Sequence, residues 1–396
     1  MEINGGTPVS FIQDYKTYTE PLEVPELFHV WCALVALSSA AQRKVWLDYD
    51  GLFQVSPNLY VCLVAPPGKC GKDTAMNKVR EILDNIPGIR TKSDSITKEK
   101  IFAYMQEITT QFPLEGHKLR AVVHSSLTIF ASEMSLLIKK GDKDFVSALN
   151  ALYNTIPVLR HSTKHNSESI IVKPFLTILA GTTPDWLNAN IQEDLLEGGL
   201  SARMIPVYSN TPKPPNYRPT VTEEGRAALG RILKRLEEIV QIGGEFSLAP
   251  RTWDLYKVWY EEHHRKEPSN KHMAGYHWRK RTHLLKLSML YSLAESNKLV
   301  VEPDHLDLAL ATLAITEPVI EQAYARVGQN PLSPIAQDIL DSIRSKGRIS
   351  VAELVRQNYH RLDERGLKEV VSVLCQMGFV KVEPTPEGVF IVSKPK

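Results

Sequence analysis

The sequence has 396 residues, of which 23% are charged and 43% hydrophobic, and its formal net charge is +2. This composition is typical of a globular protein of two or three domains. The net charge excludes neither nucleic acid nor other partners, because local patches decide such binding. The sequence has no signal-peptide profile and no apolar run near the roughly 20 residues that span a bilayer. We therefore expect a cytoplasmic protein without a membrane partner.

The cysteines and histidines show no metal-site spacing. No C-x-x-C pair is present among the four cysteines, which are Cys32, Cys62, Cys70 and Cys375. A structural zinc site and a disulfide framework are therefore not expected. The histidines at 161, 165, 263 and 264 also match no known metal-ligand spacing.

The first half of the sequence alternates between helical and extended patterns. Residues 8–45 are apolar on more than one face, which predicts helices packed on both sides and an N-terminal helical segment over 1–45. Beyond it, strands are predicted near 59–65, 125–134 and 173–184, with helices over 73–86 and 144–155. This alternation predicts a parallel α/β sheet, with a core domain over 46–210.

The second half of the sequence changes character after a proline-rich linker at 210–225. Residues 223–326 show helical patterns without a strand signal, which predicts an all-helical domain. Residues 333–396 contain three helical patterns, the second opened by Ser350 and the third by Asp363, and then two β-rich runs around a turn. This order is typical of a winged-helix domain.

A phosphate-binding loop is indicated between the first of these strands and the helix after it, in the stretch "APPGKCGKDTA" (residues 65–75). Such a loop aims backbone N–H groups at phosphates from a helix N-terminus, with a lysine near the β- and γ-phosphates and a hydroxyl for Mg²⁺. Gly68 and Gly71 permit the unusual backbone angles, and Lys72 directly precedes the helix. This arrangement predicts a site for ATP and Mg²⁺.

The loop departs from the standard pattern at two positions. Pro66 stands where the pattern has glycine, and Asp73 stands where it has Ser or Thr. Thr74, one residue later, is the nearest hydroxyl. The alternative interpretation is a tight strand-to-helix turn whose lysines face solvent.

Three other segments supply candidate catalytic residues. Glu133 follows an apolar strand and can hold Mg²⁺ or polarise the attacking water; a solvated carboxylate is the other interpretation. Thr182 and Thr183 end the next strand, where a polar side chain can sense a γ-phosphate. Arg203 follows a double glycine and can reach a phosphate in its own chain or in a neighbouring subunit, unless it is an ordinary surface or ion-paired arginine.

Taken together, the stretches 57–76, 124–134, 162–187 and 198–210 resemble a family of phage- and prophage-encoded P-loop ATPases, most of them of unknown function or helicase-like replication proteins. The resemblance covers about residues 10 to 320. It implies a P-loop NTPase core with a RecA-like or AAA+-like parallel sheet, in the cytoplasm of a bacterial host cell. It also implies that 223–326 is a lid-like domain.

The family's loops often have a lysine followed by a small residue and then threonine. By that likeness Lys72 and Thr74 take the phosphate and Mg²⁺ roles, and Asp73 stands at a tolerated position. The loop thus resembles a family variant of the P-loop.

Two groups of basic residues are candidates for DNA contact. The first lies in the helical region at Arg279, Lys280 and Arg281, beside His277; a solvated helix face is the alternative. The second lies in the winged-helix region, where the third helix commonly enters the major groove. Its members are Arg361, Arg365, Lys368 and Lys381, with Lys394 and Lys396 at the wing. Nearby acidic residues reduce the net positive charge of this second group, which weakens the case for DNA binding. Many winged helices bind proteins instead.

The leading hypothesis is an ATP-dependent DNA motor or replication-initiation ATPase of a phage or mobile element. It would act as a homo-oligomer, with a hexameric ring as one form, and Arg203 would act on a neighbour's nucleotide. A second hypothesis is a loader or adaptor that binds nucleotide as a switch without productive hydrolysis. A third is a regulator in which the winged helix recognises one DNA site and the core only dimerises.

Overall fold

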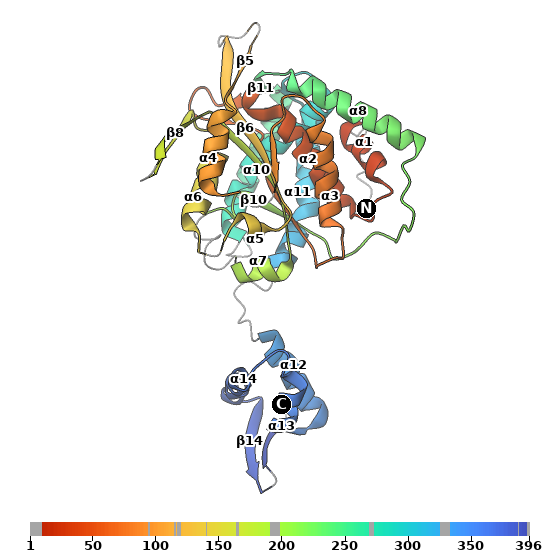
Figure 1. The fold of residues 1–396 in the computed structure, drawn as a ribbon, viewed down its shortest axis with the longest axis vertical. Coiled ribbons are helices and arrows are strands. Elements are labelled where there is room, and N and C mark those ends of the chain that lie inside the picture. Colours follow the sequence, from red (N-terminus) through yellow and green to blue (C-terminus); the bar gives the residue numbers. More distant parts are fainter. Residues whose placement is uncertain are drawn as a thin grey trace. The chain divides into compact units, whose positions relative to one another are not determined.

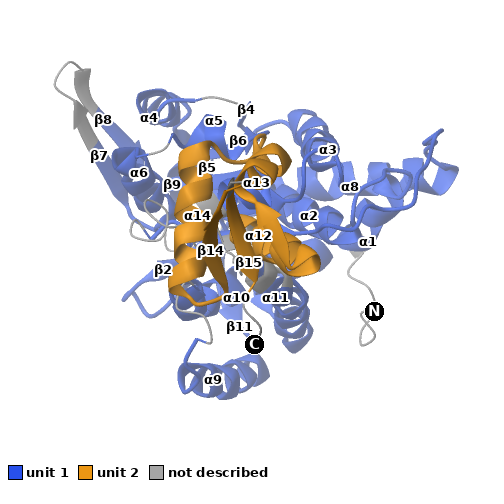
Figure 2. Cartoon of the chain, turned by 90° about the horizontal axis from the view of Figure 1, so that it is seen from below, with its two compact units in different colours: residues 1–327 blue, residues 328–396 orange. Residues whose placement is uncertain are grey.

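The structure is a computed structural model that describes residues 10–93, 96–114, 116, 120–139, 141–163, 166–190, 199–268, 273–324, 333–386 and 388–393. The chain divides into two compact units, residues 1–327 and residues 328–396 (Figure 2). The three segments expected over 1–45, 46–210 and 223–326 all fall within the first unit and contribute to one hydrophobic core.

A mostly parallel sheet forms the centre of the first unit (Figure 1). Its strands lie in the order β10-β3-β9-β6-β4, and each neighbouring pair in this row is parallel. A further strand, β5, pairs antiparallel with the start of β6. The strands are β3 (Tyr60–Val64), β4 (Thr91–Ser93), β5 (Thr110–Pro113), β6 (Ala121–Ala131), β9 (Pro174–Thr182) and β10 (Met204–Tyr208). The predicted α/β class is confirmed.

The parallel arrangement follows from the apolar strand sequences. All five residues of β3 and all nine of β9 are buried, so neither strand alternates between a core face and a solvent face. Such continuous apolar runs are typical of parallel strands covered by helices on both faces.

Helix α2 (Glu26–Ala41) packs against β3, β6, β9 and β10 and lies beside α3 (Lys72–Asp84) (Figure 1). Thirteen of its residues are buried, which agrees with the prediction of packing on both sides. Hydroxyl groups join this helix to the sheet, since Ser38 shares a hydrogen bond of 2.8 Å with Thr177 of β9. The expected N-terminal helical segment is therefore part of the sheet's own core.

The remaining helices of the first unit surround this sheet. They are α1 (Ser10–Thr19), η1 (Gln42–Lys44), α4 (Lys98–Glu107), α5 (Met134–Leu137), α6 (Lys143–Tyr153), α7 (Pro184–Asn190), α8 (Glu223–Val240), α9 (Pro250–His264), α10 (Ala274–Glu295) and α11 (Pro303–Tyr324). The helices predicted over 73–86, 144–155 and the second half are confirmed. Across the described ranges, none of the helices combines the length and apolar character needed to cross a bilayer.

The prediction that 223–326 contains only helices is wrong. A second sheet, in the order β12-β11-β1-β2, includes β11 (Gly244–Leu248) and β12 (Val300–Val301) from this region. These strands pair with β1 (Val45–Asp48), which in turn pairs with β2 (Gln54–Val55). β11 alternates buried and exposed residues over only five positions and β12 has two residues, and the β1 strand with which β11 pairs is distant in the sequence. An antiparallel pair, β7 (Val158–Thr163) and β8 (Asn166–Val172), completes the unit.

The second unit contains three helices and a three-stranded antiparallel sheet around its own core. Its elements are α12 (Ser333–Lys346), β13 (Arg348–Ser350), α13 (Val351–Asn358), α14 (Glu364–Gln376), β14 (Val380–Thr385) and β15 (Gly388–Ser393). The expected caps are present, since Ser350 accepts a hydrogen bond from the backbone N–H of Glu353 and Asp363 accepts one from Gly366. The short strand β13 was not predicted.

Buried histidines make the stability of the first unit sensitive to acid. His29 of α2 is 3% exposed, and burial lowers its pKa from 6.5 to about 4. Both ring nitrogens lack a hydrogen-bond partner among the described residues. Between these two pKa values the unfolded chain binds a proton at His29 that the folded chain does not. The free energy of unfolding is therefore at its full value above about pH 6.5, falls as the pH drops from 6.5 towards 4, and changes no further through His29 below about 4.

We expect a His29→Leu variant to gain stability over the wild type as the pH falls from 7 to 4, reaching about 3 kcal/mol at pH 4. Urea unfolding at pH 7, 5.5 and 4 measures this difference. His264→Leu, at an exposed position of α9, is the control and should show no such trend. A His29→Leu difference that is constant over this range would contradict the assignment.

Candidate functional site

The loop between β3 and α3 has the backbone geometry that a phosphate cradle needs. Gly68 and Gly71 adopt φ values of 66° and 57°, in the left-handed region that favours glycine. Gly71 is also tightly packed, because a Cβ there would lie 3.0 Å from Cγ2 of Val24 and 3.3 Å from the backbone oxygen of Glu23. Both glycines singled out in the sequence are therefore required by the loop's conformation.

Lys72 begins α3 and reaches back across this loop. Its Nζ donates a hydrogen bond of 3.0 Å to the backbone oxygen of Ala65, the first residue after β3. The next two residues, Asp73 and Thr74, are exposed in the first turn of the helix. An acidic residue in this turn interacts favourably with the helix dipole, so Asp73 suits the helix N-terminus in the absence of a bound anion.

Glu133 lies at the same edge of the sheet as Lys72. Strands β3, β9 and β6 are parallel neighbours, so their carboxyl ends meet at one edge, and Glu133 follows β6 by two residues. Burial raises the pKa of Cys62 in β3 to about 12, and the charges of Lys72 and Glu133 then shift it in opposite directions. Both charges therefore influence the same buried thiol in β3, although these residues are far apart in the sequence.

The end of β9 fills the space between those two residues. Gly181 packs so closely on β6 that a Cβ there would lie 2.5 Å from the backbone oxygen of Ser132. The next residue, Thr182, is fully buried, and its hydroxyl has no hydrogen-bond partner among the described residues. Thr183 instead caps α7, where its hydroxyl accepts a hydrogen bond of 3.2 Å from the backbone N–H of Trp186. Of the two threonines, Thr182 is thus the one with an unused polar group.

Arg203 lies at the opposite edge of the sheet. It directly precedes β10, whose first residue Met204 is level with Tyr60 at the start of β3. The phosphate loop follows the other end of β3, which five residues of about 3.3 Å each place about 15 Å away. Arg203 donates a hydrogen bond of 2.8 Å to the backbone oxygen of Gly199. The structure does not bring Arg203 to the phosphate loop of its own chain.

The basic cluster on α10 divides between two surroundings. Lys280 pairs with Glu317 of α11 at 2.7 Å. Arg281 donates a hydrogen bond of 2.9 Å to the hydroxyl of Tyr260, and the guanidinium of Arg279 lies 6.0 Å from the ring centre of Tyr153. Arg279 and Arg281 line a common cavity, and Lys280 does not. The three residues are therefore not one continuous basic surface.

Three of the four described candidate DNA-binding residues of the second unit are ion-paired. Arg361 pairs with Asp338, Lys368 with Glu364 and Lys381 with Glu383, at 2.8, 2.7 and 2.6 Å. Arg365 is exposed on α14. Lys394 and Lys396 lie outside the described residues.

No group of three or more His, Cys, Asp or Glu side chains gathers at one point in the part of the chain that the structure describes. His263 and His277 are ring neighbours, with centroids 4.1 Å apart. A comparison of the sequence with models of known protein families finds no match, and a comparison with curated proteins finds none either.

The unused hydroxyl of Thr182 carries a measurable cost in stability. We expect Thr182→Val to raise the free energy of unfolding by about 1 kcal/mol, because valine has a similar shape and removes an unpaired polar group. Thr177→Val in the same strand is the matched control. Thr177 is equally buried but shares a hydrogen bond with Ser38, so its replacement should lower the free energy of unfolding by a similar amount.

Urea unfolding of the ligand-free protein measures both changes. Equal destabilisation by the two variants would show that the Thr182 hydroxyl is satisfied in solution.

Proposed function

We propose that this chain is a P-loop ATPase of the RecA-like or AAA+-like class that acts on DNA in a phage or mobile element. The observation that carries the proposal is the meeting of Lys72, Glu133 and Thr182 at the carboxyl edge of three parallel strands. In open α/β sheets, ligands bind outside the carboxyl ends of the strands, where the strand order reverses direction.

The strand order supports this location. After β3 the chain moves to β4 at the far end of the row, returns through β6 and β9, and then crosses to β10 on the other side of β3. The reversal therefore lies at β3, the strand that carries the phosphate loop. The insertion of β9 between β3 and β6 separates the lysine from the glutamate by one strand, as expected for a RecA-like or AAA+-like core.

In the proposed mechanism the loop N–H groups and Lys72 bind the β- and γ-phosphates, and Lys72 exchanges the backbone oxygen of Ala65 for a phosphate oxygen. Glu133 orients a water molecule whose oxygen attacks the γ-phosphorus, and the bond from that phosphorus to the β–γ bridging oxygen breaks. The hydroxyl of Thr182 is free to donate to a γ-phosphate oxygen.

We propose that this edge also holds Mg²⁺ when a nucleotide is bound. Magnesium sites in such enzymes use one or two protein groups together with substrate phosphates, so the absence of a larger acidic cluster in the described residues is compatible with one. Thr74 and Glu133 would hold the ion. When bound, Mg²⁺ offsets the charge of the phosphates.

The position of Arg203 favours an oligomeric ATPase in this proposal. Because it lies at the edge away from its own loop, its route to a phosphate leads through a neighbouring subunit. A homo-oligomer, with a hexameric ring as one form, would satisfy this requirement. Helices α8–α11 share the core of the sheet, so we propose them as a fixed extension rather than a hinged lid.

The second unit is proposed as a winged helix. Its order of helix, strand, two helices and a hairpin supports this fold, with α14 as the helix that would enter a DNA groove. The acidic partners of Arg361, Lys368 and Lys381 oppose tight DNA binding, so a protein partner is the alternative role. The same pairs weaken the hypothesis of a winged-helix regulator.

A nucleotide-switched loader without productive hydrolysis is the second candidate. Asp73 favours it, because its carboxylate occupies the position at which a standard P-loop holds the Mg²⁺ hydroxyl. Without that hydroxyl the Mg²⁺ needed for hydrolysis would lose a ligand, while the loop N–H groups and Lys72 would still bind phosphate.

We expect ATP hydrolysis by the wild type to increase with single-stranded DNA and to fall roughly 100-fold or more in Lys72→Ala and in Glu133→Gln. Lys72→Ala should also lose binding of a fluorescent ATP analogue, because it removes a phosphate ligand. Glu133→Gln should retain that binding, since the amide has nearly the same shape. Lys78→Ala is the control, because Lys78 lies on the same helix and pairs with Glu81.

Unchanged hydrolysis in Lys72→Ala would rule out this loop as the catalytic site. Tight nucleotide binding by the wild type without turnover would select the loader. Absence of nucleotide binding would mean that residues 65–75 form only a turn.

A further inference from the structure

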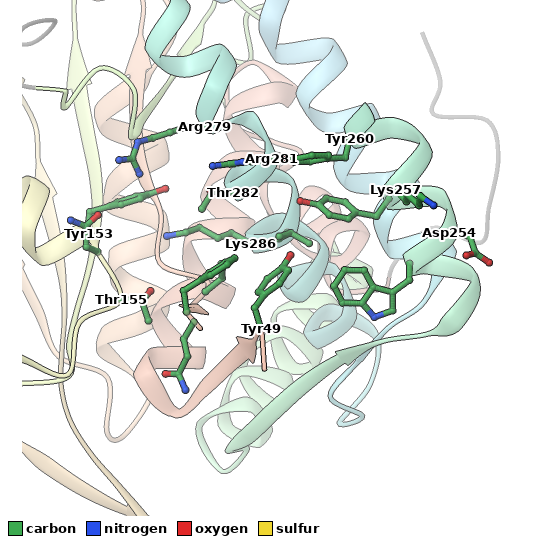
Figure 3. A pocket seen from close by; sticks show the side chains of 17 residues that line it. Tyr49, Tyr153, Thr155, Asp254, Lys257, Tyr260, Arg279, Arg281, Thr282 and Lys286 are labelled. Atoms are coloured by element: carbon green, nitrogen blue, oxygen red, sulfur yellow. Dashed lines mark hydrogen bonds between the residues drawn. The ribbon is translucent and has the colours of Figure 1, made fainter. Parts of the chain in front are cut away.

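A cavity of about 800 Å³ opens at the amino edge of the strands, away from the phosphate loop. It lies between the β1–β2 hairpin, the end of α6, and helices α9 and α10 (Figure 3). Figure 3 shows Arg279 and Arg281 extending from α10 on the side of the cavity where Tyr153 lies. The proposed ATPase mechanism does not use this cavity.

The cavity has more cationic than acidic side chains, since Arg279, Arg281 and Lys257 line it together with one carboxylate, Asp254. Lys286 is 1% exposed, with Nζ 3.8 Å from the ring centre of Tyr153 and a hydrogen bond of 3.0 Å to the backbone oxygen of Asn58. Burial lowers its pKa well below the usual value, and the neighbouring charges of Arg279, Arg43 and Arg203 lower it further.

The carboxylate among the described lining residues lies apart from this charge. Asp254 is the one acidic residue among those that line the cavity, and it points away from the arginines in Figure 3. Within the described residues, Arg279 has neither a hydrogen bond nor an ion pair. Positive groups gathered without a counter-charge are destabilising unless an anion joins them.

A row of aromatic rings forms the other wall of the cavity. Phe53 stacks on Tyr49 with centroids 4.3 Å apart and an angle of 16°. Tyr49 then meets Trp253 edge-on at 5.8 Å, and the row continues along α9 through Tyr256 and Tyr260. Phe53 is 54% exposed and Trp253 39%, so both present ring surface to a ligand.

Arginines beside exposed aromatic rings are the groups that bind single strands, because phosphates pair with the cations and unstacked bases lie on the rings. A duplex does not fit this chemistry, since its bases are already stacked on one another. Phe53 and Trp253 lie on either side of Tyr49 in the row, so the two exposed rings offer separate surfaces for two bases. We propose that this cavity binds single-stranded nucleic acid, with bases on Phe53 and Trp253 and phosphates on Arg279 and Arg281.

This proposal deepens the nucleic-acid part of the proposed function and does not depend on ATP hydrolysis. It is tested with the full chain and a 5′-labelled oligothymidylate of about 20 nucleotides, without ATP, by fluorescence anisotropy. We expect Arg279→Gln and Phe53→Ala each to weaken binding roughly ten-fold. Arg226→Gln, an exposed arginine of α8 outside the cavity, is the charge-matched control and should bind like the wild type.

The salt dependence of the affinity for the strand distinguishes the phosphate contact of Arg279 from the base stacking of Phe53. Arg279→Gln should reduce the slope of log affinity against log salt by about 0.7, because one phosphate contact is lost. Phe53→Ala should leave the slope unchanged, since stacking releases no counterions. Far-ultraviolet circular dichroism of the variants checks that both fold. Thymidine 5′-monophosphate should compete only weakly, and a 20-base-pair duplex should bind less tightly than the strand.

Four results would overturn the proposal. If the wild type binds the strand and both cavity variants bind it equally well, the strand lies elsewhere and the DNA part of the proposed function stands. If the wild type does not bind the strand, the cavity has another ligand, whatever the Lys72 result. If the monophosphate competes as strongly as the strand, the ligand is a free nucleotide. If Arg226→Gln weakens binding as much as Arg279→Gln, only general charge is involved.

Discussion

The burial of β9 between β3 and β6 is the constraint on which the rest of the structure depends. All nine residues of this strand are buried, so it can lie only in the interior of a sheet covered on both faces. Its position fixes the separation of its two neighbours. One neighbour carries the phosphate loop and the other carries Glu133, and the small Gly181 lets the end of β9 approach the backbone at Ser132.

Helix α2, which covers one face of this sheet, is held in place by hydrogen bonds as well as by apolar contacts. Helix α2 is bonded to β9 through Ser38 and Thr177, to β6 through Ser39 and Thr128, and to α11 through Trp31 and Thr316. Buried hydroxyl groups that find partners fix the register of a helix on a sheet, because any slip leaves them unpaired. Against this background the unpaired hydroxyl of Thr182 is an exception, and it lies at the candidate site.

The two edges of the sheet have different chemistry. The carboxyl edge has a glycine loop, a lysine, a glutamate and a free hydroxyl, which suits a triphosphate. The amino edge has Arg203, Arg279 and Lys286 around Tyr153, which suits a longer anion with aromatic parts. Helix α10 contributes to the second edge and also packs on α2, which covers the first sheet. The proposed nucleotide and strand sites are thus parts of one packed body.

The sequence by itself determined the alternation of strands and helices, the loop with Gly68, Gly71 and Lys72, and the caps at Ser350 and Asp363. Each of these depends on neighbours in the sequence: apolar periodicity, backbone freedom at glycine, and a side chain bonding three residues ahead. The aromatic spacing of Trp253, Tyr256 and Tyr260 was equally visible but predicts only a helix face.

Only the tertiary structure decided which distant residues meet. In the folded chain Glu133 lies at the same edge of the central sheet as Lys72, and Arg203 lies at the opposite edge. Lys280 pairs with Glu317 and does not share the cavity of Arg279 and Arg281. The tertiary structure also paired β11 with β1, some 200 residues apart. Strand order and helix rotation arise from the packing of whole elements, and no local pattern encodes them.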